Sequence, residues 1–166
     1  MIITIENILS WLPEFRESLG TIVCTSGGFD PIHPGHTSCI QKSKKYGDTL
    51  IVIVNGDSFL ERKKGKAFMD LEARCKIVDS LKHVSYTVPY EAEEDGVDEA
   101  LKLIRPDVFT KGGTYKDAAN IREWDTCKFL GIRIVIDVGD KKYNGSSDYL
   151  FDWGRFCIEE RERILN

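Results

Sequence analysis

Residues 21–36 read Thr21-Ile22-Val23-Cys24-Thr25-Ser26-Gly27-Gly28-Phe29-Asp30-Pro31-Ile32-His33-Pro34-Gly35-His36. The first five residues are β-branched or apolar for the most part, which predicts a strand over 21–25. Gly27 and Gly28 allow a sharp backbone turn and expose N–H groups to an incoming anion. Pro34 suits the first turn of a helix, whose N-terminus attracts negative charge. The stretch therefore predicts a strand, a glycine turn and a helix that begins at an anion site.

The rest of the chain repeats this alternation of strands and helices. Residues 49–54 are apolar apart from Thr49, as in a strand buried on both faces. Further strands are expected over 84–88, 107–110 and 132–138, and helices over 34–46, 70–82, 97–104 and 147–165. Residues 61–66 are expected to form a basic loop and residues 91–95 a solvated acidic turn. The pattern predicts an α/β fold: a Rossmann-like, doubly wound parallel sheet of about five strands.

The chain length favours one domain over residues 1–166. The pattern of residues adds an extra helix before the first strand and a closing helix at the C-terminus. The chain has 166 residues, of which 42% are hydrophobic, enough for a single sizeable core. Ligands bind beyond the carboxyl ends of the strands in such sheets. We therefore expect the chemistry just after residues 25, 54, 110 and 138.

Composition excludes several classes of protein. The formal net charge is −4, without the basic excess of a nucleic-acid binder. The N-terminus lacks the features of a signal peptide, and no apolar run approaches membrane-spanning length. Five scattered cysteines without a C-x-x-C pair are typical of reduced thiols. We expect a cytoplasmic protein with no nucleic-acid and no membrane partner.

Two of the three histidines stand at the start of the helix over 34–46. His33 and His36 are three residues apart and can share one helix face, and Gly35 leaves room for a ligand. Two imidazoles beside a phosphate can donate hydrogen bonds to oxygens that gain charge in a transition state. A single histidine is more often structural, as expected for His83. The pair, placed after a glycine turn, favours a phosphate site.

The segment from Gly28 to His36 resembles the first signature of the HxGH nucleotidyltransferase superfamily, in its cytidylyltransferase-like branch. This branch includes glycerol-3-phosphate cytidylyltransferase and the nucleotidyltransferase domain of ADP-heptose synthase. The resemblance covers roughly residues 20–150. It continues through Lys64-Gly65, Glu72-Ala73-Arg74, Arg105-Pro106-Asp107-Val108 and Lys111-Gly112-Gly113-Thr114-Tyr115.

The resemblance implies an enzyme that transfers a nucleoside monophosphate from CTP or ATP to a phosphorylated small molecule, with release of pyrophosphate. It implies catalytic roles for His33, His36 and Lys64. The nucleotide would be bound by Gly27, Gly28, Phe29, Asp30, His33, His36, Lys111, Gly112, Ser146 and Ser147. The acceptor would lie near Asn55, Asp57 and Arg74. No metal-ligating residues are expected, and Mg²⁺ would arrive with the triphosphate.

The last family signature differs in this chain. Ser146 and Ser147 match its hydroxyl pair, which can cap a helix while binding phosphates. Its arginine is missing, with Lys141 or Lys142 as stand-ins, and Asp148 takes a hydroxyl position. In the lysine loop, Lys63 and Lys66 are alternatives to Lys64 if the register is shifted. Asp30 is expected to orient a histidine, to meet the metal ion or to stabilise the turn.

Several alternatives stay open. The acceptor is expected to be a sugar phosphate or polyol phosphate, with the branch as a whole favouring CTP and the run 111–115 favouring ATP. A rival is an adenylyltransferase acting on a coenzyme precursor (flavin, pantetheine or nicotinamide mononucleotide). The second rival is a non-catalytic nucleotide-binding protein, because a fold alone does not fix function. A homodimer is expected, since isologous pairing is the commonest assembly.

Overall fold

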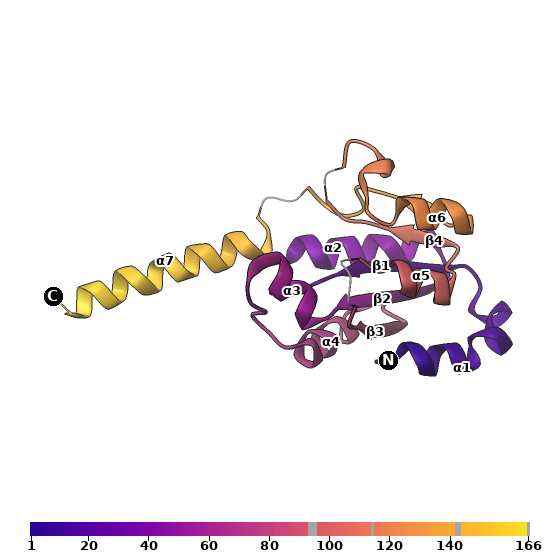
Figure 1. Cartoon of the computed structure of the whole chain (residues 1–166), viewed down its shortest axis with the longest axis horizontal. Helices are drawn as coiled ribbons and strands as arrows, with labels where there is room; N and C mark the ends of the chain where they lie inside the picture. The colour runs from indigo at the N-terminus through magenta and orange to yellow at the C-terminus, as the bar shows by residue number, and fades with distance from the viewer. Residues whose placement is uncertain (93–95, 114, 142–143, 166) are drawn as a thin grey trace.

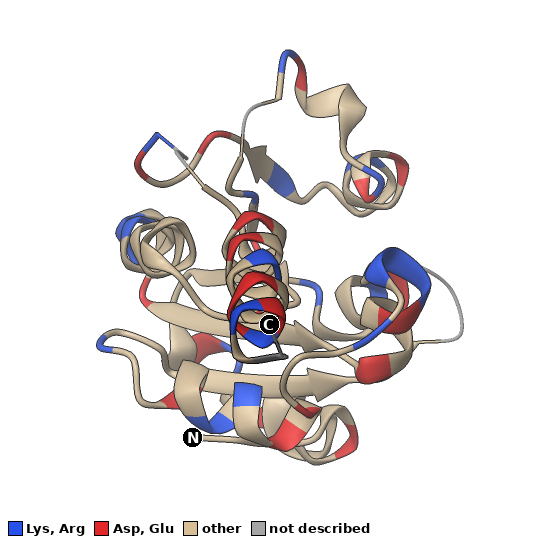
Figure 2. Cartoon of the chain, turned by 90° about the vertical axis from the view of Figure 1, so that its left-hand side faces the viewer, with Lys and Arg blue, Asp and Glu red and all other residues tan. Residues whose placement is uncertain are grey.

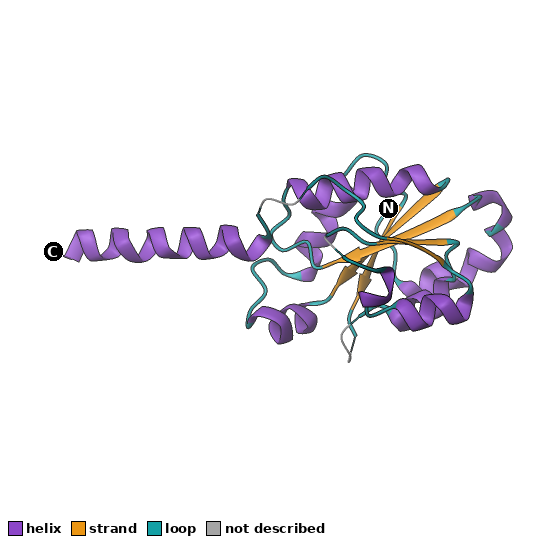
Figure 3. Cartoon of the chain, turned by 90° about the horizontal axis from the view of Figure 1, so that it is seen from above, coloured by secondary structure: helices purple, strands orange, loops and turns teal. Residues whose placement is uncertain are grey.

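The computed structural model describes residues 1–92, 96–113, 115–141 and 144–165. Five strands form one sheet in the order β3-β2-β1-β4-β5 (Figures 1 and 3). All four neighbouring pairs are parallel. The strands are β1 (Ile22–Gly27), β2 (Thr49–Asn55), β3 (Tyr86–Tyr90), β4 (Val108–Thr110) and β5 (Arg133–Val135). This topology confirms the predicted Rossmann-like sheet, and β1 and β4 flank the point at which the strand order reverses.

Helices cover both faces of the sheet. Ile8 of α1, Leu101 of α5 and Cys127 of α6 belong to the core on one face. Ile40 of α2 and Val78 of α4 belong to the core on the other face. The helices are α1 (Ile5–Phe15), α2 (Pro34–Ser43), α3 (Asp57–Lys64), α4 (Leu71–Asp79), α5 (Asp98–Ile104), α6 (Trp124–Leu130) and α7 (Ser146–Leu165). Because both faces are covered, β2 is buried along its whole length, as its apolar sequence predicts.

Two helices differ from the sequence-based expectation. Residues 61–64 belong to α3, where a basic loop was predicted over 61–66. The Glu91 carboxylate explains α3, since it accepts hydrogen bonds from the N–H groups of Asp57 and Ser58 in the first turn. Gly65 then ends the helix with φ of 87°. The short helix α6 was not predicted, and β5 occupies only part of the predicted 132–138.

The closing helix expected at the C-terminus is α7, which extends away from the sheet (Figures 1 and 3). Several of its large apolar side chains are exposed, among them Phe151 (78% exposed) and Trp153 (63% exposed). Within the described residues, no helix combines the length and the apolar character needed to cross a membrane. Helix α7 is therefore a long, partly apolar helix whose large apolar side chains are mostly exposed in the described part of the chain.

Candidate functional site

A cavity of about 460 Å³ lies at the carboxyl ends of β1 and β4, where the strand order reverses. Parallel sheets bind ligands at this position because the loops that follow neighbouring strands diverge there. The residues that line it come from segments far apart in the sequence. They are Thr25, Ser26, Gly27, Gly28, Phe29, His33, Gly35, His36, Cys39, Asn55, Phe59, Lys63, Lys111, Gly112, Gly113, Tyr115, Val138 and Asp140.

The two histidines stand together in the wall of this cavity. Their rings are stacked, with centroids 3.8 Å apart. The ring of Phe29 supports His36 edge-on at 5.1 Å. Both imidazoles lie at the N-terminus of α2, where backbone N–H groups and the helix dipole favour an anion. The spacing predicted from the sequence thus produces one compact pair of donors.

His33 is also the N-cap of α2, because its Nδ1 accepts a hydrogen bond from the N–H of Gly35 at 3.1 Å. An accepting Nδ1 places the proton of a neutral imidazole on Nε2, which becomes the donor. A Cβ atom at position 35 would lie 2.9 Å from Cε1 of His33. A side chain at position 35 would therefore force the ring of His33 to shift.

Lys64, expected at the phosphates, does not line the cavity. Its Nζ lies 2.7 Å from the buried Asp30 carboxylate and donates to the Asp30 carbonyl at 2.6 Å. Asp30 also accepts from the N–H groups of Phe68 and Met69. Asp30 therefore fastens the segment after α3 to the glycine turn. The neighbouring Lys63 lines the cavity instead.

Arg74, expected at the acceptor, is completely buried. Its guanidinium donates to the carbonyls of Met69, Gly28 and Asn55, and to the Asp57 carboxylate. It is absent from the cavity lining. The geometry favours a role in holding together the glycine turn, the end of β2 and the start of α3.

Asn55, by contrast, lies where the sequence places it. Its side chain lines the cavity and is buried. Its Oδ1 has no hydrogen-bond partner among the residues that the structure describes. A buried amide oxygen without a partner favours a ligand donor at this position. The Asp57 carboxylate pairs with Arg74 and accepts a hydrogen bond from the N–H of Leu71.

The start of α7 meets the glycine turn. Ser146 Oγ donates to the Pro31 carbonyl at 2.9 Å, and Ser147 lines a smaller cavity with Lys64 and Phe68. Asp148 accepts from the N–H of Gly145, so its carboxylate caps α7. Lys141 lines a cavity beside His33, whereas Lys142 lies outside the described residues.

Cys39 lies in the cavity wall next to Gly112. Burial raises the pKa of its thiol above the ordinary cysteine value. The thiol is therefore neutral near pH 7, and the thiolate that a cysteine nucleophile needs is not formed. Four of the five cysteines are buried, and Cys157 on α7 is exposed.

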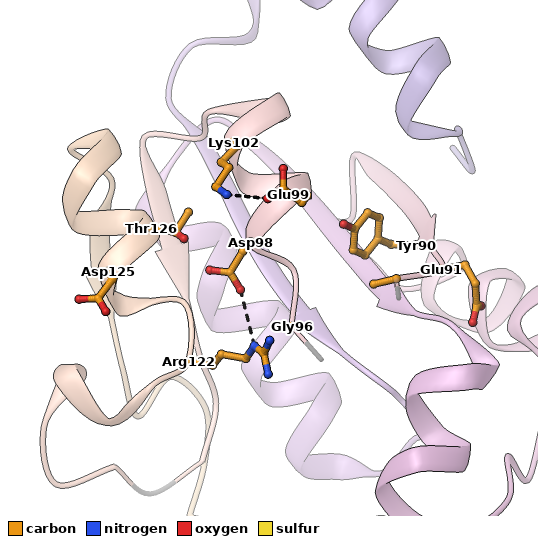
Figure 4. Close-up of a pocket in the computed structure, with 10 residues that line it drawn as sticks. Tyr90, Glu91, Gly96, Asp98, Glu99, Lys102, Arg122, Asp125 and Thr126 are labelled. Carbon is orange, nitrogen blue, oxygen red and sulfur yellow. Dashed lines mark hydrogen bonds and ion pairs between the residues drawn. The ribbon is translucent and has the colours of Figure 1, made fainter. Parts of the chain in front are cut away.

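A second cavity, about 730 Å³, lies beside the carboxyl end of β3, between α5 and the start of α6 (Figure 4). Among the described residues, four carboxylates and two cations line it: Glu91, Asp98, Glu99 and Asp125, with Lys102 and Arg122. Lys102 pairs with Glu99, and Arg122 lies 3.8 Å from Asp98. An excess of acids opposes a phosphate. The smaller cavity with the histidines is therefore the better candidate for a phosphorylated ligand.

Glu123 is a site residue that sequence reasoning missed. It lies just before α6 and is only 2% exposed. Its carboxylate lies 3.0 Å from Nζ of Lys111, which lines the cavity as predicted together with Gly112. The one available signal was a glutamate a short distance after the glycine run at 112–113, which indicates nothing without the fold.

The described residues contain no group of three or more His, Cys, Asp and Glu side chains that could hold a metal ion. Protein carboxylates that bind Mg²⁺ usually do so together with substrate phosphates.

The family model described as cytidylyltransferase-like matches residues 24–147. The bifunctional protein HldE of Haemophilus ducreyi is 38% identical over 117 residues, which cover 69% of this chain and 24% of that protein. HldE of Desulfatibacillum aliphaticivorans is 30% identical over 134 residues, covering 80% of this chain and 27% of that protein. The chain thus spans about a quarter of the length of these relatives.

Two solved structures are similar. The lipopolysaccharide core biosynthesis protein from Thermoplasma volcanium has a TM-score of 0.60 and 30% identity, covering 75% of this chain and 99% of that one. Pantoate-beta-alanine ligase from Francisella tularensis has a TM-score of 0.63 and 16% identity, covering 90% of this chain and 72% of that one, which shows the fold alone. The family match includes the glycine turn, both histidines and the start of α7. This chain belongs to the cytidylyltransferase-like family of nucleotidyltransferases.

Proposed function

We propose that this chain transfers a nucleoside monophosphate from a nucleoside triphosphate to a phosphorylated small molecule and releases pyrophosphate. The observation that carries the proposal is the stacked pair of His33 and His36, which lines a cavity at the N-terminus of α2. A helix N-terminus with two imidazole donors is suited to a polyphosphate. Family membership supports the same reaction class.

A phosphate oxygen of the acceptor attacks the α-phosphorus, a new P–O bond forms, and the bond to pyrophosphate breaks. A phosphate monoester is mostly a dianion at pH 7, since its second pKa is about 6. The nucleophile is already ionised, so the mechanism requires no general base. Catalysis then consists of positioning and of stabilising charge on the phosphate oxygens.

In this proposal His33 and His36 donate to oxygens of the α- and β-phosphates. The cation at the α-phosphate comes from the end of α3. Lys64 would have to exchange the Asp30 carboxylate for a phosphate, whereas Lys63 already lines the cavity. Separate Lys63→Met and Lys64→Met variants test the two: the lysine that serves the transition state lowers kcat, and the other changes mainly stability or KM.

We propose that Ser146, near the glycine turn, and Asn55, with its unpartnered oxygen, complete the substrate contacts. The acceptor is a sugar phosphate or polyol phosphate, and the similarity to HldE over residues that include 111–115 favours ATP. Mg²⁺ would be bound by the triphosphate oxygens.

The decisive experiment measures pyrophosphate release from ATP and CTP with a panel of sugar and polyol phosphates. We expect release with at least one pair, and His36→Ala should lower kcat by about 10²–10³-fold, as for other donors to a transition-state oxyanion. The matched control is His83→Asn, which alters an exposed histidine with φ of 80° outside the cavity. Normal rates in His36→Ala would refute the assignment. Folded protein that binds nucleotide and releases no pyrophosphate with any acceptor would favour the non-catalytic alternative.

Pyrophosphate release with a coenzyme precursor instead of a sugar or polyol phosphate would favour the rival adenylyltransferase function.

We also propose a cytoplasmic location, which the free cysteines support.

We propose further that the chain forms a homodimer through α7. Large apolar side chains of α7 are exposed, including Phe151, Trp153 and Ile158. Both acidic and basic residues lie along this helix (Figure 2). Five acids against three arginines over 146–165 suit pairing with a second copy better than an anionic membrane surface, which attracts a basic excess.

A further inference from the structure

The carboxylate of Glu123 is buried beneath the cavity, yet it belongs to none of the motifs that identify the family. One of its oxygens bonds to Nζ of Lys111 at 3.0 Å. The other, Oε2, is buried without a hydrogen-bond partner among the described residues. A carboxylate that is only 2% exposed and half satisfied is unfavourable for packing alone. Its position is explained by the cation that it holds.

Lys111 is held on three sides. Its ammonium donates to the Glu123 carboxylate and, at 3.1 Å, to Ser26 Oγ at the end of β1. The ring of Phe109 lies below it, with the centroid 5.3 Å from Nζ. An ammonium group has three hydrogens, and two of them are used by these oxygens. A ligand oxygen in the cavity that Lys111 lines would take the third.

We propose that Glu123 is a positioning residue, which holds Lys111 beside Ser26 so that the remaining donor of the lysine meets a phosphate oxygen of a bound substrate. Lysine otherwise has a flexible four-carbon stem and loses rotamer freedom when it binds. The buried carboxylate restrains the stem before the substrate arrives, which lowers the entropic cost of that contact. This inference rests on the proposed function, in which the cavity binds a nucleotide and a phosphorylated acceptor.

A double-mutant cycle tests it. Glu123→Gln keeps the shape of the side chain and removes its charge, and Lys111→Met removes the ammonium. We expect each substitution to weaken binding of the affected substrate about tenfold, which is the effect of losing one charge-assisted hydrogen bond. In the Lys111→Met background, Glu123→Gln should change binding less than twofold, because its target is gone. The control Glu99→Gln breaks an exposed pair with Lys102 and should change nothing.

Two readouts identify the phosphate. If it belongs to the nucleotide, the Kd of ATP or CTP rises in the absence of acceptor. If it belongs to the acceptor, the nucleotide Kd stays constant and the KM of the acceptor rises, with kcat less affected. Independent effects of the two substitutions, or a Glu123→Gln variant with unchanged or tighter substrate binding, would overturn the inference.

Thermal unfolding of each variant separates loss of the fold from loss of the contact. If Glu123→Gln does not fold, Ser26→Ala removes the other anchor of Lys111 and is subject to the same cycle.

Different results refute the positioning role and the proposed reaction. Wild-type protein that binds no nucleotide refutes both, and additive effects with normal wild-type turnover refute the positioning role alone. Coupled effects on nucleotide binding without any turnover support the positioning role and leave the proposed reaction refuted.

Discussion

Replacing Arg74 by methionine tests whether this residue serves the fold or the acceptor. The substitution keeps an unbranched side chain and removes a fully buried guanidinium. Three backbone carbonyls then lose their donor, and Asp57 loses its cation. Breaking a buried ion pair from one side costs about 3–5 kcal/mol. Because the Asp57 side chain is 39% exposed, water can compensate that part of the loss.

We therefore expect the free energy of unfolding to fall by about 3–4 kcal/mol, combining the carbonyls left without a donor with a discounted ion pair. For a domain of this size each kcal/mol lowers Tm by about 2–4 °C, so the melting temperature should fall by about 6–16 °C. Urea denaturation followed by circular dichroism measures the free energy directly. Arg155→Met, which removes an exposed partner of Asp152 on α7, is the control and should stay within about 0.5 kcal/mol.

The outcome that would refute this reasoning is specific. An arginine that contacts the acceptor would, when replaced, raise the acceptor KM while Tm stayed at the wild-type value. Such a result would restore the role expected from the sequence and contradict the buried hydrogen-bond network. A large loss of stability with an unchanged KM in the folded fraction would support the network.

Three further predictions concern other parts of the molecule. Asp30→Asn should lower the free energy of unfolding by about 3–5 kcal/mol, because a buried carboxylate no longer holds the segment after α3. Tryptic cleavage after Lys64 should accelerate in limited proteolysis for the same reason. Cleavage of the variant at the wild-type rate would contradict this role of Asp30. At pH 8 one thiol per native chain, Cys157, should react rapidly with a disulfide reagent, whereas all five should react in denaturant. Burial raises the pKa of Cys75 to about 11 and of Cys127 to about 12, so these thiols stay neutral in the folded chain while those of the unfolded chain ionise near 8.5. The free energy of unfolding should therefore fall as pH rises from about 8.5 towards 12. Replacing Phe151 and Ile158 by serine should convert the proposed dimer into a monomer in sedimentation velocity experiments, since both side chains are exposed in one chain. The variant's Tm should also lose the dependence on protein concentration that a dimer imposes. A wild-type protein that is monomeric at every concentration would refute the dimer.

The sequence alone determined the features that depend on local pattern. Apolar runs bounded by glycines predicted β1 and β2, and the glycine turn before Pro34 predicted the start of α2. His33 and His36 were recognised as a pair because helix geometry brings residues three apart onto one face. These inferences need only the periodicity of the chain and the conformational preferences of glycine and proline.

Only the tertiary structure decided which charged side chains reach the cavity. Lys64 pairs with a carboxylate 34 positions earlier, and Arg74 donates to a carbonyl 46 positions earlier. Helix α3 begins at hydrogen bonds to Glu91, 34 positions later. Glu123 meets Lys111 across a turn whose path no local pattern indicates. Sequence motifs give the type and order of such residues, whereas the partner of a long flexible side chain is set by which elements pack beside it. Local periodicity therefore predicted the sheet and the histidine pair, and long-range packing assigned the cations.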